Sequence, residues 1–176
     1  MSFNLPTEQI ELPSKGLVYP ESSPLSSGKI EMKYMTAKEE DILTNANYIA
    51  DGTVLDRLMK SLIVSNINYD ELIIGDKNAI MIAARILGYG KDYSFNYAGT
   101  EQTVDLTTLE NKEIDESIYT RGNNEFEFEL PQSGNKVTFK FLTHKDEQDI
   151  NKELDALKKL NKEGSAELTT RLRFMI

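Results

Sequence analysis

One strand-to-helix pattern occurs twice in the sequence, once near each end, and it constrains the fold more than any other feature. The first copy spans residues 28–40 and the second spans residues 135–147. Aligned without gaps, the copies place apolar residues opposite apolar residues, threonine opposite threonine and acid opposite acid. The matched lysines are Lys29 with Lys136, Lys33 with Lys140, and Lys38 with Lys145. The sequence leaves open whether this is an internal duplication or two independent examples of a common unit.

Each copy predicts an amphipathic strand that runs directly into a capped helix. In the first copy Ile30, Met32 and Tyr34 alternate with polar residues, the pattern of a half-buried strand. Thr36 then caps a helix, and Glu39 is placed to accept a hydrogen bond from the backbone amide of the cap. The equivalent residues of the second copy are Val137, Phe139, Phe141, Thr143 and Asp146. This unit predicts local structure but no catalytic or binding function.

Length and composition predict one domain, or one domain with appendages, and the order of the predicted strands and helices gives it the α+β class. The chain has 176 residues, of which 39% are hydrophobic and 28% charged, enough to bury a core. The predicted parts are an extended arm at 1–28, a strand and helical section at 29–90, an antiparallel β section at 91–145, and a C-terminal helix with an apolar end at 146–176.

Local signals place the elements inside these parts. Thr53 starts a helix over 54–63, and Asp76 caps the most strongly helical segment, 77–87. The predicted β-hairpins join 91–97 to 102–106 and 125–130 to 136–141, and a long helix follows over 145–160. Between the hairpins, residues 109–121 are predicted to form a polar loop with a short helical piece.

The two ends of the chain are the predicted partner-binding surfaces. Four prolines favour extended and turn conformations in the arm, yet the arm keeps several apolar side chains. Burying them and ordering the backbone nearly cancel in free energy, so we expect an arm that is loosely held until a partner adds surface. The predicted contact residues are Leu12, Leu17, Val18, Tyr19, Leu172, Phe174, Met175 and Ile176.

Composition argues against several function classes. With no cysteine and one histidine, the chain lacks the residues for a disulfide framework, a thiol nucleophile or a typical zinc site. Its net charge of −9 argues against nucleic-acid binding. No apolar stretch approaches the ~20 residues of a membrane span, and the start does not resemble a signal peptide, so we expect a soluble cytoplasmic protein. We identify no catalytic, cofactor-binding or metal-binding residues.

A family resemblance carries the functional expectation. Residues 12–16, 19–20, 30–32 and 35–43 resemble the baseplate hub assembly protein family of T-even-type contractile-tailed bacteriophages, and shorter matches continue to about residue 160. The resemblance implies a non-enzymatic tail baseplate hub component or assembly factor that acts through protein–protein contacts. Its partners would be other phage tail or baseplate proteins. It would work in the host cytoplasm during assembly, either leaving as a chaperone or staying in the virion baseplate.

One departure from the family affects the first β-hairpin. Some relatives carry a Cys-x-x-Cys pair in the turn that corresponds to residues 97–101, whereas this chain has no cysteine. We therefore expect Tyr93, Phe95 and Tyr97 to hold the hairpin by packing, without zinc.

The alternative function is a small hydrolase or nucleotide-dependent enzyme that uses the acidic clusters at 39–41 and 146–149. Such an enzyme needs a carboxylate in a concave pocket with a strongly shifted pKa. As the first turns of helices, these clusters are more simply explained as solvated faces.

Overall fold

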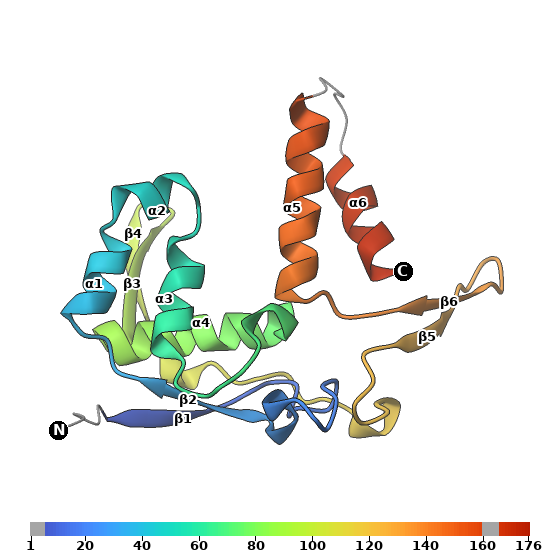
Figure 1. The fold of residues 1–176 in the computed structure, drawn as a ribbon, viewed down its shortest axis with the longest axis horizontal. Helices are drawn as coiled ribbons and strands as arrows, with labels where there is room; N and C mark the ends of the chain where they lie inside the picture. Colours follow the sequence, from blue (N-terminus) through green and yellow to red (C-terminus); the bar gives the residue numbers. More distant parts are fainter. Residues whose placement is uncertain (1–5, 160–165) are drawn as a thin grey trace.

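The computed structural model describes residues 6–159 and 166–176 (Figure 1). It has the predicted α+β class, and the described residues form helices and three two-stranded antiparallel hairpins. The strands are β1 (Thr7–Glu11), β2 (Lys29–Lys33), β3 (Asp92–Tyr97), β4 (Thr100–Asp105), β5 (Phe126–Glu129) and β6 (Lys136–Phe139). The helices are α1 (Ala37–Leu43), α2 (Ala46–Ala50), α3 (Val54–Leu62), α4 (Ile74–Tyr89), α5 (His144–Lys159) and α6 (Ala166–Met175). Short 3₁₀ turns span Pro24–Ser27, Tyr69–Glu71, Leu106–Thr108 and Glu116–Ile118.

The two copies of the repeat form the same local structure, β2 followed by α1 and β6 followed by α5. The cap amide of Thr36 donates to Glu39 Oε2 at 3.0 Å, and that of Thr143 donates to Asp146 Oδ2 at 2.9 Å, which confirms the predicted reach-back of each acid. A matched lysine at the strand end also binds each acid. Lys33 Nζ lies 2.8 Å from Glu39 Oε1, and the equivalent second-copy distance, from Lys140 Nζ to Asp146 Oδ1, is 2.9 Å.

Burial distinguishes the first acid from the second. The side chain of Glu39 is fully buried and also accepts a hydrogen bond from Ser61 Oγ of α3 at 2.7 Å. Burial by itself would raise the pKa of Glu39, but the hydrogen bonds from Lys33, Ser61 and Thr36 outweigh it and lower the pKa to about 2.

This lowered pKa makes Glu39 a source of acid sensitivity. A carboxyl whose folded-state pKa lies below its unfolded value stabilises the protein above the unfolded pKa, and this contribution is lost as pH falls through the folded pKa. We expect Glu39→Gln to lower the free energy of unfolding at pH 7 by about 3 kcal/mol and to flatten the decline in stability between about pH 5 and pH 2. Urea titrations across this range check it. Glu40→Gln, at the exposed neighbour, is the control, and parallel pH curves for Glu39→Gln and the parent chain would contradict the assignment.

The hydrophobic core includes the N-terminal arm, which corrects the sequence-based expectation. Leu12, Val18, Tyr19 and Leu25 are buried against side chains of β2, α3 and α4. Residues 7–11 form β1, which pairs with β2 in a register that places Ile10 opposite Ile30. The arm is therefore an ordered part of the domain and is not loosely held on its surface. The other buried apolar residues are Ile30, Met32, Leu58, Met59, Leu62, Tyr69, Leu72, Ile73, Ile80, Ala84 and Ile150.

The arm is held as a closed loop by close backbone contacts at two glycines, Gly16 and Gly28. The amide of Leu12 donates to the carbonyl of Gly28 at 2.8 Å, joining the ends of the loop. Gly16 has a φ of +77°, and a Cβ atom there would lie 2.4 Å from the carbonyl oxygen of Ser26. Only glycine accommodates both the backbone angle and this approach. The prolines and serines therefore shape a compact loop.

One predicted boundary of the helical section is wrong. Asp76 was expected to cap α4, but the helix begins at Ile74 and Asp76 lies buried in its first turn. Residues 44–45 separate α1 from the short helix α2, which begins at Ala46 because the side chain of Asn45 accepts hydrogen bonds from the amides of Asn47 and Tyr48. The predicted positions of α3, α5 and the two later hairpins are confirmed within a few residues.

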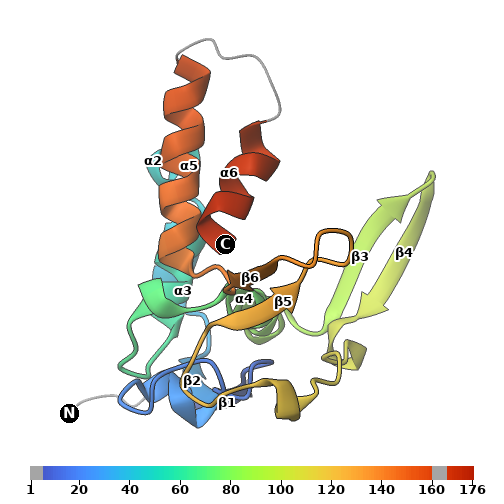
Figure 2. The ribbon, with the colours of Figure 1, turned by 90° about the vertical axis from the view of Figure 1, so that its right-hand side faces the viewer.

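The C-terminal half extends from the core in two directions. In both views α5 and α6 lie side by side, with an ion pair between Glu153 and Arg173 (Figure 1). The β3–β4 hairpin projects away from the helices (Figure 2). No helix among the described residues is both long and apolar enough to cross a membrane.

Candidate functional site

The structure divides the predicted contact residues into two groups. In the arm, Leu12, Val18 and Tyr19 are buried and Leu17 is half-buried, so they offer little surface to a partner in this conformation. At the C-terminus, 66% of Ile176 is exposed. Among the other predicted contact residues at this end, Leu172 is exposed, and Phe174 and Met175 are half-buried.

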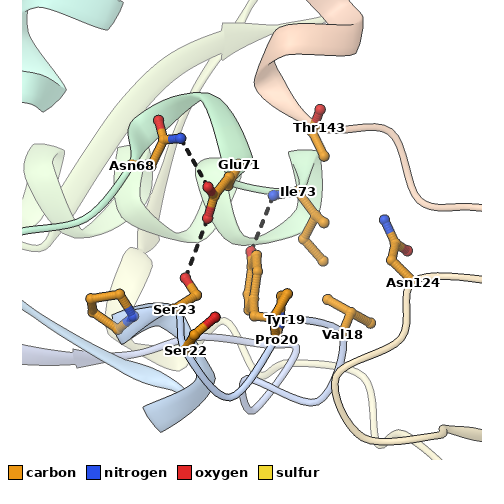
Figure 3. Close-up of a pocket in the computed structure, with 11 residues that line it drawn as sticks. Val18, Tyr19, Pro20, Ser22, Ser23, Asn68, Glu71, Ile73, Asn124 and Thr143 are labelled. Carbon is orange, nitrogen blue, oxygen red and sulfur yellow. Dashed lines mark hydrogen bonds between the residues drawn. The ribbon is translucent and has the colours of Figure 1, made fainter.

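A cavity of about 380 Å³ lies between the arm, the Tyr69–Glu71 turn and the start of α5 (Figure 3). Glu71 accepts hydrogen bonds across it from Ser23 Oγ at 3.3 Å and from Asn68 Nδ2 at 2.9 Å. The polar side chains of Ser23, Asn68 and Glu71 thus bind one another, and the cavity lies at the junction of three segments. The residues lining it are Val18, Tyr19, Pro20, Ser22, Ser23, Pro24, Asn68, Glu71, Ile73, Asn124 and Thr143.

Behind this cavity Asp76 joins the arm to α4. Its carboxylate accepts hydrogen bonds from the backbone amide of Ser14 at 3.0 Å, from Ser14 Oγ at 2.7 Å and from the Tyr19 hydroxyl at 2.6 Å. The Tyr19 oxygen in turn accepts from the amide of Ile73 at 3.1 Å. Burial raises the pKa of Asp76, and the hydrogen bonds from Ser14 and Tyr19 partly oppose that rise. With no exposed surface and both oxygens occupied, Asp76 has a structural role in this geometry.

The only histidine lies in a second polar junction, where α3, α4 and α5 meet. His144 is 1% exposed, with Nδ1 3.1 Å from Lys77 Nζ and Nε2 3.5 Å from Asp56 Oδ2. Tyr69 packs edge-on against its ring at 4.7 Å. Burial lowers the pKa of His144, which favours the neutral imidazole that accepts from Lys77. In the described part of the chain, no His, Cys, Asp and Glu side chains group as a metal site would require.

The β3–β4 hairpin presents a row of exposed aromatic side chains. Successive strand residues point to opposite faces, so Tyr93, Phe95 and Tyr97 share one face. The rings of Tyr93 and Phe95 stack with centroids 6.0 Å apart, as predicted, but Tyr97 is 70% exposed and does not join the stack. Tyr93 and Phe95 are also exposed, at 45% and 39%. We call this surface the aromatic face.

Arg85 of α4 anchors the aromatic face to the body of the domain. Its guanidinium carbon lies 5.0 Å from the centre of the Tyr89 ring and 5.8 Å from that of Tyr93. Its nitrogens also donate to the carbonyls of Gly90 and Asp92 at the base of the hairpin. Tyr89, Arg85 and Tyr93 therefore form a continuous row of side chains from α4 onto β3. Sequence reasoning placed the aromatic residues on a strand but missed Arg85; its position one helical turn before Tyr89 was the available signal.

Comparison with protein-family models, with curated proteins and with solved structures finds no match to this chain.

Proposed function

We propose that this protein is a non-enzymatic component or assembly factor of a contractile phage tail baseplate and that it acts through protein–protein contacts. The observation that carries the proposal is the projecting hairpin, whose aromatic face is uncovered and anchored by Arg85. An isolated two-stranded hairpin is marginally stable in water. Exposed aromatic surface of this kind is typical of a binding site for another protein. The sequence resemblance supplies the baseplate context.

The enzymatic alternative has one observation in its favour, the raised pKa of Asp76 beside an apolar cavity of about 430 Å³. An acid–base catalyst must reach its substrate with a free oxygen. The Asp76 oxygens instead bind Ser14 and Tyr19, and the side chain is fully buried. This geometry favours the assembly function.

The assembly function predicts a defect that leaves folding intact. In a phage that depends on this gene, we expect the triple variant Tyr93→Ser/Phe95→Ser/Tyr97→Ser to give few or no complete baseplates, because the contact surface is lost while the core is untouched. Electron microscopy of lysates measures baseplate completion. Thermal melting of the purified variant should stay within about 5 °C of the parent chain, since surface changes cost little.

The matched control substitutes the opposite face of the same strands, Ser94→Ala/Thr103→Ala, whose hydroxyls lie 2.8 Å apart. We expect normal baseplates from this control. Normal baseplates from the aromatic triple variant, or from a complete gene disruption, would contradict the proposal.

A further inference from the structure

The outer edge of β3 has the geometry of an open strand-pairing site, and the partner that fits it deepens the proposed assembly function, on which this inference rests. The hairpin register runs without interruption from Asp92 opposite Asp105 to Tyr97 opposite Thr100. Ala98 and Gly99 form the two-residue turn, both with positive φ, at 49° and 80°. In such a hairpin the pair next to the turn exchanges hydrogen bonds, and the pairs alternate from there.

This alternation directs the backbone groups of Asp92, Ser94 and Asn96 away from β4. The hydrogen bond from Arg85 Nη2 to the Asp92 carbonyl, at 3.4 Å, confirms the outward direction at the base of the strand. Beyond it, the backbone amides and carbonyls of Ser94 and Asn96 have no hydrogen-bond partner among residues 6–159 and 166–176. They form a row of unpaired donors and acceptors beside the aromatic face.

In each of the two other hairpins, one strand has a backbone contact to another segment, on its outer side or at its end, that β3 lacks beyond Asp92. The outer side of β2 is closed by residues 63–65, through the Met32–Ile63 bridge and a hydrogen bond from Val64 to Glu31 at 2.9 Å. At the end of β6, the amide of Lys140 donates to Met175 of α6 at 2.8 Å. Natural edge strands avoid unwanted pairing with lysine, proline or a bulge, and β3 contains none of these.

The charged residues of the hairpin indicate which side chains a partner strand would carry. The face of the hairpin opposite the aromatic face carries Asp92, Glu101 and Asp105. Lys91 pairs with Asp105 at 2.6 Å, whereas no cation among the described residues pairs with Asp92 or Glu101. A strand laid along β3 alternates its side chains between the two faces. Apolar side chains would therefore lie on the same side as the aromatic face. Basic side chains would lie on the opposite side, beside Asp92 of β3, whereas Glu101 and Asp105 lie one strand further away, on β4.

We propose that the outer edge of β3 binds an extended segment of a partner protein in which Lys or Arg alternates with apolar residues. The added strand extends the hairpin to three strands, covers Tyr93 and Phe95, and neutralises Asp92. A second copy of this chain fits less well, because two molecules of net charge −9 repel each other and bring like-charged faces together.

The test uses the full-length protein and two synthetic peptides, acetyl-(Lys-Val)₄-amide and acetyl-(Glu-Val)₄-amide, which share one apolar face. We expect the lysine peptide to bind at least about tenfold more tightly at low salt and to lose affinity as salt rises. In NMR titrations the amide signals of Ser94 and Asn96 should shift and saturate. No saturable binding of the lysine peptide, or equal binding of the glutamate peptide, would overturn the proposal.

Proline substitution on the two edges separates edge pairing from simple charge attraction. Ser94→Pro removes an outward amide of β3, and Thr103→Pro makes the same change on β4; neither amide joins the hairpin ladder. We expect Ser94→Pro to weaken lysine-peptide binding by about tenfold or more and Thr103→Pro to change it by less than about twofold. Undiminished binding by Ser94→Pro overturns the edge site. So does concentration-dependent dimerisation of the parent chain that Ser94→Pro abolishes.

The peptide and phage experiments fail independently. If the peptide does not bind but the aromatic triple variant still blocks baseplate completion, the assembly function stands and the edge site is wrong. If the edge binds as expected and the triple variant assembles normal baseplates, the edge site stands and the assembly function is wrong.

Discussion

Removal of residues 1–28 is expected to abolish cooperative folding. The deletion takes Leu12, Val18, Tyr19 and Leu25 out of the core and strips β1 from β2. Burying each of these side chains contributes about 1.5–3 kcal/mol, so the four together account for about 6–12 kcal/mol. The total stability of a domain is only about 5–15 kcal/mol. Circular dichroism should show a shallow, non-sigmoidal melt and reduced helix content.

A pair of single substitutions controls for the size of the deletion. Leu25→Ala, at a fully buried position, should lower the free energy of unfolding by about 2–5 kcal/mol. Leu168→Ala, at a leucine that is 66% exposed, should change it by less than about 0.5 kcal/mol. If the truncated chain melts cooperatively near the melting temperature of the parent chain, the arm is not part of the core and this prediction is wrong.

Asp76→Ala is expected to lower the free energy of unfolding by about 4 kcal/mol. The change leaves the Ser14 amide, the Ser14 hydroxyl and the Tyr19 hydroxyl without their acceptor. Each buried donor left unpaired costs about 1–3 kcal/mol. Part of that loss is offset, because the ionised carboxylate is itself unfavourable in a buried site, as its raised pKa shows. Urea denaturation at pH 7 measures the difference.

Two further variants test the cause of this loss. Asp155→Ala removes the same group at an exposed position and should change stability by less than about 0.5 kcal/mol. Tyr19→Phe removes one of the three donors to Asp76 and leaves the Ile73 amide without its acceptor, but both Ser14 donors keep their bonds to the carboxylate, so it should cost less than Asp76→Ala. A Tyr19→Phe loss as large as that of Asp76→Ala would show that the carboxylate is not the centre of the junction.

Local chemistry made part of the fold predictable. Thr36 with Glu39, and Thr143 with Asp146, form their caps within four residues of chain, so the sequence specified both helix starts. The alternation in β3 likewise placed its aromatic residues on one face. Burial of Glu39 could not be predicted, because it depends on Ser61, which packing brings alongside from 22 residues away.

The arm and the candidate site could not be predicted from local sequence, because their contacts join residues that are far apart in the chain. Asp76 follows a glycine and precedes a helical pattern, which suggests a cap, but its donors lie on the arm at a separation of 62 and 57 residues. Four prolines suggested an open arm, because composition does not reveal that Gly16 meets Ser26 and Gly28 backbone to backbone. Alternation in Tyr93 and Phe95 indicates one covered face, and the sequence contains no sign that these rings stay exposed among the described residues.

The long separation between the arm and α4 also has a consequence for synthesis on the ribosome. Ser14 leaves the ribosome 62 residues before Asp76 does, an interval of roughly 3–12 s at typical elongation rates. During that time Leu12 and Val18 have been made but the helix that covers them has not. The nascent chain therefore exposes apolar segments of the arm for seconds. In contrast, the repeat at β6 and α5 can form its helix cap as soon as it emerges. Slow codons between residues 30 and 76 would lengthen this exposure and increase the fraction of chains that aggregate before they fold.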